Sequence, residues 1–275
     1  MDKLVVNISS KRTRIRNGLS ELWAFRELLF FFIWRDVKVR YKQTVIGVLW
    51  AVLQPFFAMV VYSIVFGRMI GVPSEGVPYP IFSYTGLLPW NLFSTGISSA
   101  ATSTVSNSNL YSRVYFPRII VPTATVLTGL VDFGVAFVVL IGMMLYFGTP
   151  ITWNIVWLPL YILLTLAIAL GMSFWLSALN VRYRDVRYVT GFLTRFWLYA
   201  TPVIYPSSIA KGSFRFLVDL NPMSGVVEGF RWALLGTGVP PSGRMFVFSV
   251  IISLLVFISG VFVFRRMERS FADVI

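Results

Sequence analysis

The sequence predicts an all-α integral membrane protein with six transmembrane helices, an N-terminal cytoplasmic interface helix and re-entrant helices before the last span. The first observation is composition: of 275 residues, 57% are hydrophobic and 13% are charged, which is more apolar than a soluble domain. The second is the recurrence of apolar runs of about 20 residues, the helix length that crosses a hydrocarbon core about 30 Å thick. The third is that Lys and Arg gather in alternate connections between those runs.

Composition also narrows the classes of function. The net charge of +13 would indicate nucleic-acid binding in a soluble chain, but in a membrane protein topology is the first explanation of basic residues. We therefore expect no nucleic-acid partner. The chain has no Cys and no His, which excludes disulfides, thiolate or imidazole metal sites and imidazole acid–base chemistry. We expect neither a metal site nor a catalytic residue.

Six apolar runs are long enough to be spans, and they define a transmembrane domain at 46–275 after an interface-helix region at 1–45. Four of the runs contain proline, which membrane helices tolerate because neighbouring groups satisfy the freed carbonyls. The predicted spans are 46–66, 80–101, 123–147, 153–179, 188–205 and 245–264.

The distribution of Lys and Arg predicts that both termini are cytoplasmic. The segment before the first span carries ten of them, and the connections at 102–122 and 180–187 and the C-terminal tail carry more. All of these lie on one side if there are six spans. The loop at 206–243 places Lys211 and Arg215 on the other side. Basic residues in long loops influence the membrane orientation less than those in short loops. The prediction is a multi-pass protein of the cytoplasmic (inner) membrane.

The apolar run LWAFRELLFFFIW at 22–34 is too short to span. Arg26 and Glu27 interrupt it and no small-residue cleavage site follows, which argues against a signal peptide. We expect a helix lying in the cytoplasmic interface, with a buried soluble helix as the alternative. Four cations follow this helix, at the predicted hinge between it and the first span. We expect them to lie near anionic lipid phosphates. This cytoplasmic entrance consists of Arg35, Lys38, Arg40 and Lys42.

The second half of the 206–243 loop predicts a helix that is too short to cross. Asn221 is a plausible N-cap and Pro222 occupies the first helical position, while Glu228 and Arg231 lie three residues apart on one face. We expect a re-entrant or interfacial helix that forms a gate, in preference to a solvated loop.

The connection at 106–122 interleaves apolar and basic residues. It is either a polar turn or a short amphipathic element that docks on a partner or a membrane surface, as exposed apolar residues of this density usually do. The candidate docking residues are Leu110, Arg113, Val114, Tyr115, Phe116 and Arg118.

Three separated stretches carry a resemblance to a known family. They are RDVKVRYKQTVIGVLW at 35–50, followed by QP, then LNVRYRDV at 179–186 and NPMSGVVEGFRWALLG at 221–236. In this order they resemble the signature stretches of the ABC-2 type permeases that export polysaccharides, the family of O-antigen, capsule and teichoic acid exporters. The resemblance covers nearly the whole chain. It implies six spans per subunit, a cytoplasmic interface helix, a coupling helix between spans two and three that makes 106–122 the ATPase-coupling segment, and re-entrant helices before span six.

The resemblance also implies partners. The sequence has no G-x-x-x-x-G-K-[ST] motif to hold nucleotide phosphates, so we expect a transport subunit that is not an enzyme and has no cofactor of its own. ATP and Mg²⁺ would be bound by a separate ATPase subunit, in two copies beneath a homodimer of this chain. The substrate would be a lipid-linked polysaccharide, with O-antigen preferred to capsule or teichoic acid.

In that arrangement a channel forms between the two copies, and the sugar rings of the polymer would stack on aromatic side chains that line the channel. Aromatic residues also fill cores and form interfacial belts, which is the alternative for each ring. The lipid pyrophosphate of such substrates would suit the basic entrance at 35–42. The candidate channel residues are Phe56, Phe57, Tyr62, Tyr84, Trp90, Phe93, Phe192, Phe196 and Tyr199.

Acidic residues within the predicted membrane segments are scarce. Asp132 and Glu228 are the only acids well inside the spans or the re-entrant segment, which argues against a membrane-embedded enzyme. An ion-coupled secondary transporter that uses Asp132 is the alternative function, because intramembrane acids are commonly functional. Asp132 and Arg195 lie about 14 Å and 12 Å along their predicted spans, and this equal depth predicts an intramembrane ion pair.

Overall fold

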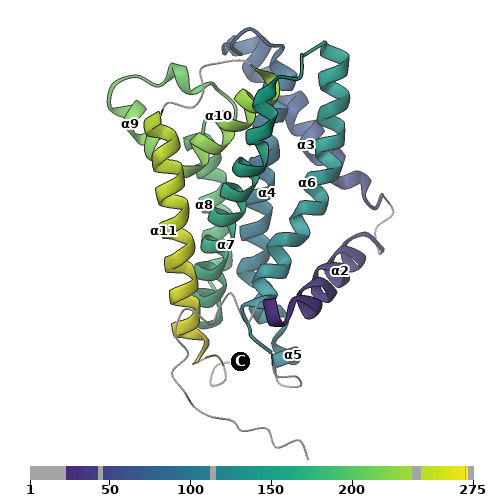
Figure 1. The fold of residues 1–275 in the computed structure, drawn as a ribbon, viewed down its shortest axis with the longest axis vertical. Helices are drawn as coiled ribbons and strands as arrows, with labels where there is room; N and C mark the ends of the chain where they lie inside the picture. The colour runs from purple at the N-terminus through teal and green to yellow at the C-terminus, as the bar shows by residue number, and fades with distance from the viewer. Residues whose placement is uncertain (1–22, 43–45, 112–115, 237–242, 270, 272–275) are drawn as a thin grey trace, which may run out of the picture.

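The computed structural model describes residues 23–42, 46–111, 116–236, 243–269 and 271. Within these ranges the chain forms helices, turns and irregular segments, with no strand. The long helices stand side by side (Figure 1). We call the end that carries α9 (Gly212–Leu220) and α10 (Pro222–Leu235) the upper end, and the end that carries α5 (Ser108–Tyr111) and Glu268, the last residue of α11, the lower end.

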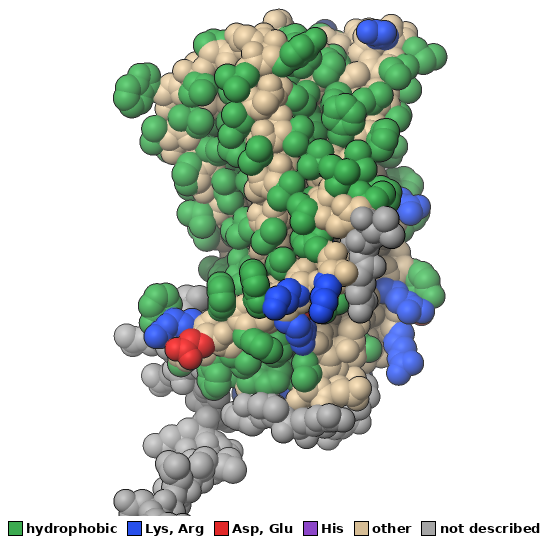
Figure 2. All heavy atoms as spheres, turned by 90° about the vertical axis from the view of Figure 1, so that its right-hand side faces the viewer, with side chains coloured by type: hydrophobic (Ala, Val, Ile, Leu, Met, Phe, Trp, Pro, Cys, Tyr) green, Lys and Arg blue, Asp and Glu red, His purple; other side chains and the backbone are tan. Residues whose placement is uncertain are grey.

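Four helices in the described ranges are long and apolar enough to cross a membrane. They correspond to the predicted first, third, fourth and sixth spans. They are α3 (Leu49–Tyr62) continued by the π-helix η1 (Ser63–Ile70), α6 (Ile120–Phe147), the 3₁₀ turn η2 (Trp153–Trp157) continued by α7 (Leu158–Arg182), and α11 (Gly243–Glu268). Figure 2 shows one side of the molecule as a broad hydrophobic surface, with most of its Lys and Arg side chains in the lower half. An exposed apolar surface of this extent is typical of contact with lipid or with another subunit.

The helix at the predicted second span is α4 (Tyr79–Ser106), which occupies the centre of the bundle. It packs against α6, α7 and α10, and its 28 residues measure about 42 Å at 1.5 Å per residue. Small polar residues lower its hydropathy. Buried hydroxyls such as those of Thr85 and Ser103 donate to carbonyls of the preceding turn of α4, so they need no other partner.

The helix at the predicted fifth span, α8 (Val186–Ala200), is shorter than expected. The prediction was 188–205, but the chain leaves the helix after Ala200 and turns through 201–205. Pro202 cannot donate a helical hydrogen bond, and the carbonyls of Pro202 and Val203 accept instead from Arg231 of α10. The turn that ends α8 is therefore held by a side chain that is distant in sequence.

The N-terminal helix α2 (Arg26–Lys42) begins later and ends later than the predicted 22–34. It slants upward beside the lower half of α6 (Figure 1), where Phe32 packs on Phe116 with ring centroids 5.5 Å apart. The opposite side of α2 is apolar and exposed, including Phe30 and Trp34. The four cations predicted at a hinge lie within the helix itself, and the first span begins after a turn in which Gly47 has φ of 56°.

The upper end contains the predicted re-entrant segment. It folds as a 3₁₀ turn η3 (Ser207–Ile209), then α9 and α10. α10 is buried along nearly its whole length and packs against α4, α7 and α11. A solvated loop is excluded by this burial.

The helices α7 and α11 approach one another closely. A Cβ built on Gly260 would stand 2.3 Å from the backbone oxygen of Gly171. Neither position can therefore carry a side chain without separation of the helices. Small residues at such crossings are typical of helix association in membranes, because they let backbones approach.

Gly260→Ala is accordingly expected to lower the midpoint of thermal unfolding of the purified protein in detergent. Overpacking of this kind costs about 1–3 kcal/mol. Gly134→Ala in α6 is the matched control, because a Cβ there meets open space and Ala is about 1 kcal/mol more favourable than Gly inside a helix. Equal midpoints for the two variants would contradict the packing argument.

Candidate functional site

A cavity of about 370 Å³ lies between α3, α4 and α6, with the end of α2 at one side. Small-ligand pockets measure about 300–1,000 Å³, so its size suits a small ligand or a segment of a larger one. Its walls combine aliphatic and aromatic residues with a few polar groups. The polar and charged lining residues are Arg40, Tyr41, Gln54, Asn91, Thr95, Ser99 and Asp132.

Asp132 stands at one wall of this cavity, about 18 Å along α6 from its first residue. Its carboxylate accepts hydrogen bonds from the Arg40 guanidinium and the Tyr41 hydroxyl at the end of α2. The predicted pair with Arg195 is wrong, because Arg195 is exposed on α8, which packs on α4 and α7. Equal depth along two predicted spans did not reveal which helices are neighbours, and the cation that pairs with Asp132 belongs to α2.

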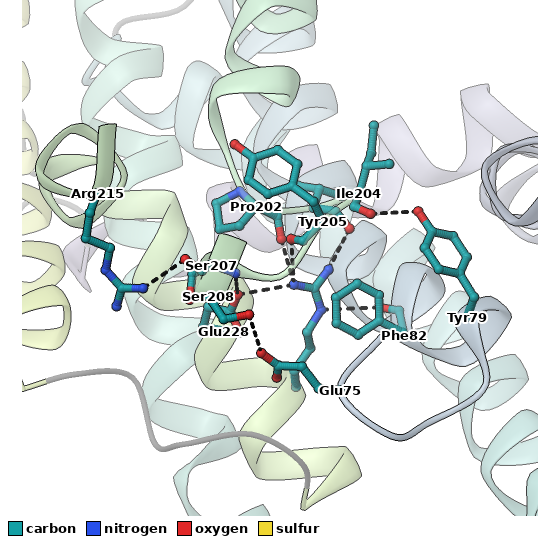
Figure 3. A network of polar contacts seen from close by, with 12 residues as sticks. Glu75, Tyr79, Phe82, Pro202, Ile204, Tyr205, Ser207, Ser208, Arg215 and Glu228 are labelled. Atoms are coloured by element: carbon teal, nitrogen blue, oxygen red, sulfur yellow. Dashed lines mark hydrogen bonds and ion pairs between the residues drawn. The ribbon is translucent and has the colours of Figure 1, made fainter. Parts of the chain in front are cut away.

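A second polar cluster lies at the upper end, around Arg231 of α10 (Figure 3). The guanidinium donates to the carbonyls of Pro202 at 2.6 Å and Phe82 at 3.3 Å, and to the Glu228 carboxylate at 3.4 Å. It also lies 3.6 Å from the centroid of the Phe82 ring. One cation therefore joins α10 to α4 and to the turn after α8.

The two charges of this cluster are shielded from solvent, since Arg231 is 1% exposed and Glu228 8%. A Cβ on Gly86 would stand 2.7 Å from the Arg231 guanidinium. Burial raises the pKa of Glu228, and the Arg231 charge opposes that rise; burial lowers the pKa of Arg231. Glu228 also accepts from the backbone N–H of Ser207 at 2.8 Å, so each charge has several partners, as buried charges require.

The predicted cap of the re-entrant helix is confirmed. The side-chain oxygen of Asn221 accepts from the backbone N–H of Met223 at 3.1 Å, and Pro222 is the first helical residue. The same amide accepts from the Trp197 indole at 3.0 Å and donates to the Thr201 hydroxyl at 2.9 Å. Asn221 thus also connects α10 to the end of α8.

The structure describes part of the predicted ATPase-coupling segment 106–122, and there it changes the roles predicted for individual residues. Arg113, Val114 and Tyr115 lie outside the described residues. Phe116 is buried against Phe32 and Tyr111, so its predicted role as an anchor for a partner is wrong. Leu110 is half-buried and packs in the same cluster.

Arg118 is also engaged within the chain. Its backbone N–H donates to the Glu268 carboxylate at 3.0 Å and its guanidinium donates to the Glu268 carbonyl at 3.1 Å. The guanidinium lies 5.5 Å from the centroid of the Tyr111 ring and 5.8 Å from that of Phe271. The prediction that Arg118 docks on a partner is therefore corrected: Arg118 holds the end of α11 against the connection that precedes α6.

The four cations of the predicted entrance have different surroundings. Arg35 pairs with Asp36 at 2.8 Å and donates to Asn107 at 3.1 Å, and Arg40 pairs with Asp132. Lys38 is exposed, with its ammonium 5.4 Å from the centroid of the Trp34 ring, and Lys42 is exposed at the end of α2. Two of the four are thus occupied by acids of this chain.

The nine candidate channel aromatics fall into two groups. Tyr84, Trp90 and Phe93 of α4 are at most 4% exposed, so the prediction that they line a path between two copies is wrong; they fill the core of one copy. The half-buried Tyr62 and five exposed rings stand on α3 and α8, both of which pack against α4. The five exposed rings are Phe56, Phe57, Phe192, Phe196 and Tyr199.

Comparison with known proteins identifies the family. Residues 27–235 match the family described as ABC-2 type transporter, a match over more than half of the chain. The chain belongs to the ABC-2 type transporter family.

Individual ABC-2 relatives cover nearly its whole length. An O-antigen export system permease protein of Myxococcus xanthus is 32% identical over 90% of this chain and 96% of the relative. A protein of the same name from Klebsiella pneumoniae is 26% identical over 90% and 95%. A polysialic acid transport protein of Escherichia coli is 22% identical over 93% and 98%.

Sequence reasoning missed the polar wall of the cavity in this ABC-2 protein. Gln54 and Asn91 are uncharged amides inside apolar runs, and Asn91 and Thr95 are four residues apart on one face of α4. That spacing could have identified Asn91 and Thr95 as part of one polar face. Tyr41 carries no such signal, because its position depends on how α2 packs against α6.

Proposed function

We propose that this chain is the channel-forming transmembrane subunit of an ATP-driven exporter that moves a lipid-linked polysaccharide, O-antigen first among the candidates, across the cytoplasmic membrane. The observation that carries the proposal is the similarity to an O-antigen export permease over 90% of the chain. Capsule-type export is the second candidate, because the chain also resembles a polysialic acid transport protein over nearly its full length.

The proposed topology has six spans and both termini in the cytoplasm. α4 and α8 join the four apolar helices as spans two and five; α4 is long enough, and the turn after α8 is supported by Arg231. The cytoplasmic side is the lower end, because ten Lys and Arg precede the first span and such residues favour the cytoplasmic side. α2 would then be the interface helix and α10 the re-entrant helix.

In this proposal two copies of the chain and two copies of a separate ATPase, which binds ATP and Mg²⁺, form the transporter. The exposed rings of α3 and α8 would face the path between the copies, since five aromatics exposed on two helices that both pack against α4 require a lipid, partner or substrate surface. Lys38 and Lys42 remain available to the phosphates of the lipid carrier or of the membrane. An ion-coupled carrier through Asp132 has less support, because Arg40 and Tyr41 already occupy the carboxylate.

Deletion of the gene in its host tests the proposal. We expect the surface polysaccharide to disappear and the lipid-linked polymer to accumulate inside the cell, and a plasmid copy to restore export. Gel analysis of lipopolysaccharide distinguishes loss of O-antigen from loss of capsule. Unchanged surface glycans in the deletion strain would overturn the export function.

We place the contact with the ATPase at the lower end, around 106–122. Arg113→Glu is expected to reduce copurification of the ATPase several-fold, because charge reversal at an interface adds repulsion between like charges. Arg244→Glu is the matched control: it makes the same change at the exposed start of α11, at the other end of the bundle. Equal copurification for both variants would place the contact elsewhere.

A further inference from the structure

The inference concerns the cavity between α2, α3, α4 and α6, and it rests on the proposed function. Two charged residues line it, Arg40 and Asp132, and they pair with one another. The cavity is therefore close to neutral. A phosphate would meet the Asp132 carboxylate and a cation would meet the Arg40 guanidinium, so neither charge sign is favoured.

The polar groups of the cavity match hydroxyl groups. The side-chain amides of Gln54, which is exposed, and Asn91, which is half-buried, form no hydrogen bond with another described residue, so both can bond a ligand. Each amide both donates and accepts, as a hydroxyl does. The Thr95 and Ser99 hydroxyls continue the polar wall at four-residue spacing after Asn91 on α4.

The remaining walls are apolar and include two aromatic residues, Trp50 of α3 and Phe133 of α6. Flat rings with a few polar groups suit a ligand that has both a hydrocarbon face and hydroxyl edges. A sugar ring has this chemistry. The volume of about 370 Å³ suits a mono- or disaccharide better than a long polymer segment.

Two residues of the cavity lining, Trp50 and Gln54, are exposed on α3, one of the two helices that we assign to the channel wall. Trp50, Gln54, Phe57 and Val61 follow one another at three- and four-residue steps on α3, and all four are exposed. A ligand in the cavity is thus continuous with the aromatic face of α3.

We propose that this cavity binds one or two neutral sugar units of the exported polysaccharide, with Gln54 and Asn91 bonding the hydroxyls. The occupant is a sugar unit and not a membrane lipid headgroup. The paired Arg40 and Asp132 close one wall of the cavity.

The absence of cysteine from the chain allows a direct test. Thr95→Cys places a single thiol in the cavity, and Ser98→Cys places one on exposed α4 surface outside the cavity lining. The full chain, purified in detergent with its ATPase, reacts with a water-soluble thiol reagent in the presence of oligosaccharides cut from the delipidated surface polysaccharide of the host. We expect the oligosaccharides to slow the reaction at position 95 and to leave the reaction at position 98 unchanged.

Two further variants connect the protection to the amides. Asn91→Leu and Gln54→Leu, each in the Thr95→Cys background, should raise the oligosaccharide concentration for half-protection about fivefold, the effect of one lost hydrogen bond. Asn91→Leu in the Ser98→Cys background, with an unaltered rate at position 98, shows that α4 is still folded.

Three results would overturn the inference: no protection at position 95, equal protection at both positions, or protection by phosphatidylglycerol that matches that by the oligosaccharide. The outcome is separable from the proposed function. If deletion of the gene abolishes the surface glycan while the oligosaccharide gives no protection, the export function is supported and the sugar site in this cavity is overturned.

Discussion

Arg231→Met is expected to abolish stable folding of the upper end of the protein. The substitution leaves the Glu228 carboxylate buried without its cation and removes the donor to the carbonyls of Pro202 and Val203. Breaking a buried ion pair by removal of one partner costs about 3–5 kcal/mol, a large part of the stability of an ordinary domain. Size-exclusion chromatography after detergent extraction should show aggregated protein, or a midpoint of thermal unfolding lowered well below that of the wild type.

Arg244→Met is the matched control. Arg244 is exposed at the start of α11, and surface substitutions usually change stability by less than about 0.5 kcal/mol. The double variant Arg231→Met with Glu228→Met tests the mechanism further. It should stay unstable, because the carbonyls of the turn after α8 still lack a donor. Wild-type stability of the double variant would mean that charge pairing alone explains Arg231.

Exchange of the charges of Arg40 and Asp132 is expected to restore part of the folded protein that is lost when either residue is changed alone. Arg40→Ala leaves the Asp132 carboxylate unpaired within α6, where an unpaired charge costs about 3 kcal/mol on insertion scales. Asp132→Ala leaves the half-buried Arg40 of α2 without its acid. We expect both single variants to give less folded protein and less export. Arg40→Asp combined with Asp132→Arg recovers opposite charges across the contact between α2 and α6, so folded yield should rise above that of either single variant.

Arg195→Ala serves as the control for this exchange. Arg195 is exposed on α8, so its removal should change folded yield little, as surface substitutions usually change stability by less than about 0.5 kcal/mol. A loss of folded protein in Arg195→Ala as large as that in Arg40→Ala, or no recovery in the exchanged variant, would mean that the Arg40 contact does not govern the position of α2.

The sequence by itself determined the elements that depend on composition and local pattern. A run of about 20 apolar residues must become a helix that buries its backbone polar groups, so four spans appear within a few residues of their predicted bounds. The cap at Asn221 was predictable for a similar reason, because an N-cap and a proline at the first helical position act on the nearest turn only. A helix before the first apolar run was predicted, but its bounds, Arg26–Lys42, were not.

The tertiary structure decided every feature that depends on which helices are neighbours. Asp132 was recognised as an intramembrane acid, but depth along a span says nothing of direction around it, so its partner was found on α2 and not on α8. Tyr84 was a candidate channel residue and Phe116 a candidate docking residue, but both are buried by packing within the chain. Gln54 and Asn91 face one cavity only because α3 and α4 meet there. Hydropathy and charge act on each segment alone, whereas a cavity, an ion pair or a buried ring requires two segments to meet.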